Sequence, residues 1–150
     1  MTEAVITLAV LAVLGSLAIP TYQGVRDGLE GNRQVITLSG YVAKARNIAA
    51  EAGNDYQYPT DVVDQLTSLD SRISSGASSE SIVSAWREDS DTMVFAATAV
   101  DGRCYVVVDV ISSDRQYYAY DPSVLSCAAS SAEIIDVTGT LEEPNVIDLN

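Results

Sequence analysis

Residues 1–22 read MTEAVITLAVLAVLGSLAIPTY, and the run from Ala4 to Val25 contains no charged side chain. At about 1.5 Å per residue, a helix of that length would cross the hydrocarbon core of a bilayer. Three residues interrupt the apolar pattern: Glu3, Gly15 and Pro20. Residues 1–25 are therefore predicted to form an apolar helix half that lies in a membrane or in the core of an assembly.

The acid at Glu3 argues against a secretory signal peptide, because such a peptide begins with a basic region. A carboxylate at the start of an apolar helix is costly unless it lies at the membrane interface or finds a positive partner. We expect Glu3 to pair with a terminal α-amino group, that of Met1 or that of a neighbouring subunit. The alternative is an interfacial acid that the helix macrodipole favours in the first turn.

Gly15 and Pro20 weaken the same stretch of helix. Proline removes a backbone donor and clashes with the carbonyl four residues earlier, and glycine lowers helix propensity. A helix that must bend or extend while it packs beside copies of itself could use such a break. The alternatives are a simple kink or membrane exit at Pro20 and ordinary small-residue packing between helices at Gly15.

The charge of the chain is strongly negative and unevenly distributed. The net charge is −13, and residues 51–150 carry eighteen acidic and four basic side chains. A surface this acidic repels nucleic acid, so we expect no direct nucleic-acid partner. The chain has no histidine, which excludes histidine-based catalysis and histidine metal sites.

The helix is expected to continue over residues 26–52 as an amphipathic second half. Its apolar stripe is Val35, Leu38, Val42, Ala45, Ala49 and Ala52, at spacings of three and four. Gly53-Asn54-Asp55 is a stop signal. A connecting loop over 53–91 follows, in which Thr60 could cap a short helix and Trp86 is expected to pack in the core against the long helix.

From Thr92 the apolar pattern has a period of two, which predicts an antiparallel sheet over residues 92–121. The expected strands are 92–100, 103–111 and 116–121, and Asp101-Gly102 predicts a two-residue hairpin between the first two. In the second strand Cys104, Val106, Val108 and Val110 share one face. One face of the sheet should receive the helix, and the other should be partly exposed.

The two cysteines, Cys104 and Cys127, are too far apart for a C-x-x-C motif. In an exported protein they predict one structural disulfide, with two buried free thiols as the alternative. The C-terminal segment 122–150 contains two more strand-like runs, 133–138 and 145–149, which could add an edge strand or contact a neighbouring subunit. The predicted fold is thus α+β, a long helix packed on an antiparallel sheet of three to four strands, with a disulfide-closed C-terminal segment. We expect a globular domain over 26–150.

No catalytic set is recognisable in the sequence, so we expect neither an enzyme nor a cofactor. The acids Asp109, Asp114 and Asp121 flank the sheet turns, and we expect them to be solvated carboxylates, with a calcium site as the alternative. An aromatic set is formed by Tyr105, Tyr117, Tyr118 and Tyr120. Cross-strand packing explains these side chains best, with subunit contact or adhesion as the alternative.

Glu3, the apolar run and Leu17-Ala18-Ile19-Pro20-Thr21-Tyr22 resemble the N-terminal segment of type IV pilins and the related pseudopilins. In that family the glutamate is the fifth residue of the processed chain, whereas here it is the third. Either the mature terminus differs from Met1 or the stagger between subunits differs.

The resemblance implies the major subunit of an extracellular type IV pilus-like filament, a helical homopolymer built around the apolar helices. It implies insertion in the cytoplasmic membrane before assembly, a pilus assembly machinery as partner, and roles in motility, adhesion or DNA uptake. Assembly would depend on Met1 and Glu3, and Gly15 with Pro20 would mark the helix break. The alternatives are a pseudopilin of a type II secretion or competence system and a monomeric membrane-anchored extracellular binding domain.

Overall fold

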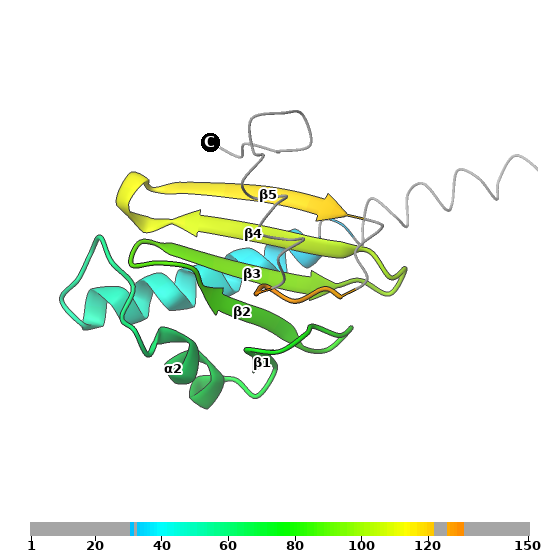
Figure 1. The fold of residues 1–150 in the computed structure, drawn as a ribbon, viewed down its shortest axis with the longest axis horizontal. Coiled ribbons are helices and arrows are strands. Elements are labelled where there is room, and N and C mark those ends of the chain that lie inside the picture. The colour runs from blue at the N-terminus through cyan, green and yellow to red at the C-terminus, as the bar shows by residue number, and fades with distance from the viewer. Residues whose placement is uncertain (1–30, 32, 122–125, 131–150) are drawn as a thin grey trace, which may run out of the picture. The chain divides into compact units, whose positions relative to one another are not determined.

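The structure is a computed structural model that describes residue 31, residues 33–121 and residues 126–130. The predicted apolar half over 1–25, with Met1, Glu3, Gly15 and Pro20, lies outside the described residues, as does the tail from residue 131. The described part of the chain is α+β, with one five-stranded mixed sheet (Figure 1). The fold class is therefore confirmed, whereas the prediction of three to four antiparallel strands is wrong.

A helix over residues 33–51 lies across one face of the sheet, as Figure 1 shows. Four members of the predicted stripe are fully buried in it, namely Leu38, Val42, Ala45 and Ala49. Ala52 is exposed, because the helix has already ended. Gly53 has φ +74° and donates to the Ala50 carbonyl, and Asn54 donates to the Ala49 carbonyl. These are the hydrogen bonds of a Schellman cap, which confirms the predicted stop.

The region 53–91, predicted as a connecting loop, contains three regular elements. They are α2 (Val62–Leu69), β1 (Ile73–Ser74) and β2 (Val83–Arg87). The Thr60 cap is wrong, because Asp61 occupies the N-cap position of α2 and makes no side-chain cap hydrogen bond. The two strands were missed because they are two and five residues long, too short for an alternating pattern to stand out.

The sheet order follows the chain: β1, β2, β3 (Thr92–Thr98), β4 (Cys104–Val110) and β5 (Arg115–Asp121). β1 pairs with β2 in parallel, and every later pair is antiparallel. A short 3₁₀ helix, Ile111–Ser113, joins β4 to β5. The three strands predicted over 92–121 are thus confirmed, with bounds that differ by a few residues.

The turn between β3 and β4 is longer than the predicted two-residue hairpin. The Gly102 amide donates to the Ala99 carbonyl and the Ala99 amide donates to the Arg103 carbonyl, each at 2.9 Å. Three residues, Val100 to Gly102, therefore form the loop, and Gly102 has φ +83°. A type I turn followed by a left-handed residue gives this geometry, and glycine adopts it without strain.

The central strands are buried on both faces. The face toward the helix contains Phe95, Tyr105 and Val107. The opposite face, called here the far face, contains Val94, Cys104 and Val106. Residues 126–130 cross the far face (orange in Figure 1), so the expected partly exposed face is covered at its centre.

Candidate functional site

The disulfide is the one predicted site that the described residues test directly. Cys104 on β4 and Cys127 form a disulfide with their Cα atoms 5.4 Å apart. Of the two alternatives left open, paired cysteines and buried free thiols, the first is correct. The four other predicted site residues, Met1, Glu3, Gly15 and Pro20, lie outside the described part of the chain.

Three hydrogen bonds hold the segment 126–130 against the far face in addition to the disulfide. The Ser78 amide and hydroxyl both donate to the Cys127 carbonyl, at 2.7 and 2.6 Å. The Ala129 amide donates to the Ser84 hydroxyl at 2.8 Å. The segment is therefore tied to β2, to β4 and to the loop before β2. It covers an apolar patch formed by Val94, Ala96, Val106 and Val108.

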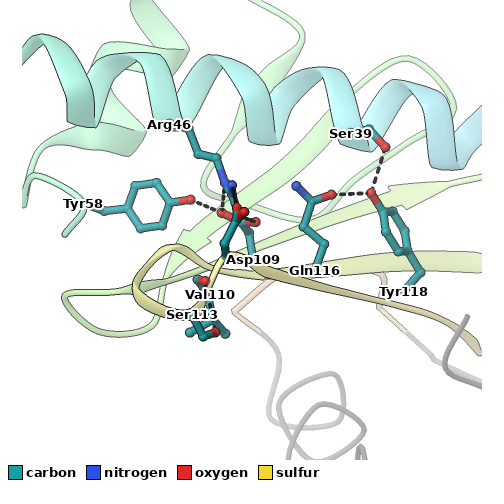
Figure 2. A network of polar contacts seen from close by, with 9 residues as sticks. Ser39, Arg46, Tyr58, Asp109, Val110, Ser113, Gln116 and Tyr118 are labelled. Carbon is teal, nitrogen blue, oxygen red and sulfur yellow. Dashed lines mark hydrogen bonds and ion pairs between the residues drawn. The ribbon is translucent and has the colours of Figure 1, made fainter. Parts of the chain in front are cut away.

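A fully buried acid, Asp109, lies on β4. Its side chain is fully buried, and it accepts two hydrogen bonds from Arg46 of the 33–51 helix. The Tyr58 hydroxyl donates to the same carboxylate, and Arg46 also pairs with the exposed Asp114. Figure 2 shows Arg46 and Tyr58 converging on Asp109 from the helix and from the segment that follows it. Three separate parts of the chain thus meet at one carboxylate.

The environment of this carboxylate shifts the pKa values of its two partners upward. Burial raises the pKa of Tyr58 far above its usual value, and the hydrogen bond to Asp109 adds to the effect. The hydrogen bond to Asp109 also raises the pKa of Arg46. Tyr58 therefore stays a neutral donor and Arg46 a cation over the whole physiological range.

A second polar link lies farther along the same helix. The Ser39 and Tyr118 hydroxyls are 2.8 Å apart and share a hydrogen bond, and the Tyr118 hydroxyl lies 2.7 Å from the Gln116 side-chain oxygen (Figure 2). Tyr118 is on β5 and is buried. The helix is thus fastened to β4 near one end and to β5 near the other.

A third polar link joins the helix to Asp70, which follows α2. Asp70 accepts hydrogen bonds from Arg72, Lys44 and Tyr41. The hydrogen bonds from Arg72 are the main reason that the pKa of Asp70 lies well below its usual value. This cluster ties the helix to the α2–β1 connection through ion pairs and hydrogen bonds, beside the apolar core that the helix shares with α2 and β1.

Two solvent-open hollows flank the helix. One, of about 250 Å³, lies beside Arg33, Tyr41 and Arg72, and the other, of about 310 Å³, lies beside Arg46, Tyr56 and Asp114. No group of three or more acids or cysteines in residues 33–121 and 126–130 could hold a metal ion. Every buried side-chain nitrogen or oxygen in the described part has a hydrogen-bond partner. The buried polar side chains of the described part are therefore all engaged in hydrogen bonds.

Two predictions about single side chains are corrected. Asp109 was expected to be a solvated acid and is fully buried. The burial of Asp109 could have been predicted from the alternation of side chains along the strand, because Asp109 lies two residues beyond Val107 and so on the face toward the helix.

Trp86 was expected in the core against the long helix, but it is 40 % exposed on the far side of β2 and donates to Glu88. It pairs with Val94 of the far face across the strands, whereas its neighbour Ala85 takes the inward position.

Comparisons with protein-family models, with curated proteins and with solved structures find no match to this chain. Among the residues that the structure describes, no helix combines the length and apolar character needed to cross a membrane. The charge-free run Ala4 to Val25 lies outside them.

Proposed function

We propose that this chain is the structural subunit of an extracellular, type IV pilus-like filament. The observation that carries the proposal is the charge-free run from Ala4 to Val25, which directly precedes an acidic, disulfide-closed α+β domain. The run needs a nonaqueous environment. A membrane supplies this environment before assembly, and copies of the same run supply it in the filament core.

The acidic domain is suited to the outside of such a filament. Residues 51–150 have a net charge of −14. Side chains of one sign keep neighbouring domains hydrated and disfavour contact between their outer surfaces. Association is then directed to the apolar run, where the copies carry no charge.

The links between helix and sheet support a role for the helix in transmitting force to the domain. Arg46 joins the helix to Asp109 on β4, and Ser39 joins it to Tyr118 on β5. A subunit held in a filament by its N-terminal segment must transmit any pull on that segment to its domain. Two polar links and a buried apolar face on one helix supply that connection.

The disulfide supports an oxidising, extracellular location for the domain, because structural disulfides persist outside the cytosol. The bond fixes residues 126–130 across the far face. The family resemblance of Glu3, Pro20 and the residues between them points to the same location.

The test is electron microscopy of material sheared from the surface of cells that express the chain. Thin filaments composed of this chain are expected, and a detergent-soluble monomer without filaments would overturn the proposal in favour of a membrane-anchored domain. Glu3→Ala should reduce filament yield and leave the folded domain intact, because it removes the partner of a terminal amine. Glu30→Ala is the matched control, since it removes an acid beyond the apolar run and should preserve assembly.

A further inference from the structure

The far face keeps an exposed apolar edge beside the segment 126–130. Trp86, the only tryptophan of the chain, is 40 % exposed there. It begins a cross-strand row that continues through Val94 and Val108 to β5. Val110, two residues beyond Val108 on the same face, is only partly buried. The described residues therefore leave part of the apolar surface of the far face uncovered.

The polar group of Trp86 is already used within the subunit. Its indole N–H donates to the Glu88 carboxylate at 3.0 Å. The part of Trp86 that remains available is therefore the apolar ring, which is among the largest apolar surfaces that a side chain can offer. Contact of this ring with water is unfavourable. An occupant of this edge should accordingly be apolar.

The segment 126–130 leads directly to the exposed edge. The disulfide holds Cys127 on β4, and the Ala129 amide donates to the Ser84 hydroxyl on β2 at 2.8 Å. The segment therefore crosses the far face from β4 toward β2. Ser84 precedes Trp86 by two residues on the same strand, a distance of about 7 Å. Two further residues of extended chain span that distance.

The residues that follow have the length needed to return across the sheet. The run 133–138 has the sequence EIIDVT, and six extended residues span about 20 Å. From β2 to β5 there are three strand spacings in the sheet order, or about 14 Å. The run can therefore reach from Trp86 to β5, and residues 131 and 132 remain for the turn before it.

We propose that residues 133–138 lie across the far face of their own domain, over Trp86 and the row that it begins, and run antiparallel to the segment 126–130. The disulfide favours the chain's own residues over those of a second copy. It fixes the start of the run on this face, which gives the run a high effective concentration there. A second copy would have to bring residues 51–150, with a net charge of −14, against a domain of the same sign.

The alternation of the run assigns its side chains to two sides. Ile135 and Val137 lie on one side of an extended chain, and Asp136 lies on the other. The apolar pair would face Trp86 and the valines of the far face, and the acid would face water. The run then supplies the apolar occupant that the exposed indole ring requires.

Trp86 is a built-in reporter, because no other tryptophan contributes to the fluorescence of the chain. The test compares the detergent-solubilised full chain with a variant that ends at Ser130. The shortened chain should emit at a wavelength several nanometres longer and be quenched more strongly by acrylamide, because water reaches the ring. Far-UV circular dichroism and an intact disulfide on a non-reducing gel check the fold. Emission and quenching equal to those of the full chain would overturn the proposal.

Two point variants make the test independent of any unfolding that the shortened chain suffers. Ile135→Asp places a charge on the covered side of the run and should reproduce the shift. Ile147→Asp makes the same change in the second strand-like run, 145–149, and should leave the emission unchanged. Any other pattern would overturn residues 133–138 as the occupant.

A mixing experiment separates the chain's own run from that of a second copy. The full chain with Trp86→Phe carries the run but no tryptophan, and it is added in excess to the variant that ends at Ser130. The emission should stay at the longer wavelength, because each run covers the domain to which it is tethered. A return to the wavelength of the full chain would overturn the proposal in favour of a neighbouring copy. The measurement uses solubilised chains, so its result does not depend on whether filaments form.

Discussion

Arg46 and Asp109 are 63 residues apart in the chain and form a two-pronged ion pair between the 33–51 helix and β4. The Arg46 Nη2 donates to Asp109 Oδ1 at 2.7 Å, and its Nε donates to Oδ2 at 3.0 Å. The carboxylate is fully buried, whereas the guanidinium keeps partial contact with solvent. A planar guanidinium matches a carboxylate in this way, so the pair fixes the orientation of the helix on the sheet.

Removing the cation of this pair should destabilise the domain strongly. Arg46→Met leaves Asp109 charged and buried without its main partner, and we expect the free energy of unfolding to fall by about 3–5 kcal/mol. Urea denaturation measures the loss. Lys44→Met on the same helix breaks the exposed pair with Asp70 and should cost less than about 1 kcal/mol. Equal losses for the two variants would contradict the special role of the buried pair.

Tyr58 should make the domain sensitive to alkaline pH. Its pKa is raised in the folded state by burial and by Asp109, so the unfolded chain loses this proton first, near the usual tyrosine pKa of about 10. Stability is therefore complete below that pH and falls as the pH rises above it. In Tyr58→Phe the alkaline decline should be shallower, as measured by urea denaturation at a series of pH values.

The same variant has a second expected effect at neutral pH. Tyr58→Phe removes the hydroxyl that donates to Asp109 and should lower the free energy of unfolding by about 1–3 kcal/mol. Burial also raises the pKa of Tyr41, so Tyr41 lowers the stability of both the native protein and the variant at alkaline pH. Only the difference between the two pH profiles therefore reports on Tyr58. Identical pH slopes would refute the assignment.

Loss of the disulfide should release the segment over the far face. Replacing Cys104 and Cys127 together by serine should cost about 3 kcal/mol, the value that the chain-entropy model gives for a loop of this size. It should also expose Val94 and Val106 and increase the binding of a hydrophobic dye. Reduction of the native protein serves as the control and should reproduce both effects. An unchanged denaturation midpoint would show that hydrogen bonds alone hold residues 126–130.

Two glycines should respond in opposite directions to substitution by alanine. Gly40→Ala places a methyl group in open space on the helix and should stabilise the domain by about 0.5–1 kcal/mol. Gly53→Ala forces a side chain into the left-handed conformation of the helix cap and should destabilise it by about 1 kcal/mol or more. Thermal unfolding of the two variants compares them directly. Stabilisation by Gly53→Ala would contradict the cap.

The helix and the central strands were predictable because their patterns are local and long. The apolar stripe from Leu38 to Ala49 repeats over three turns, and β3 and β4 are seven residues each. β1 and β2 were not predictable in this way, since β1 has two residues and is a strand only because β2 lies beside it. The buried ion pair was equally hidden, because nothing near Asp109 in the chain indicates Arg46 as its partner.

The sequence by itself determined where the chain is apolar, where it is acidic, where its periodicity changes from helix to strand, and which two cysteines could pair. Each of these depends on neighbouring residues or on composition. Only the tertiary structure decided which face each strand buries, and so why Asp109 is enclosed and Trp86 is exposed. The physical reason is that side chains alternate between the two faces of a strand, so the sequence assigns each residue to a face but does not indicate which element covers that face. In this fold the helix covers one face and the disulfide-held segment covers the centre of the other.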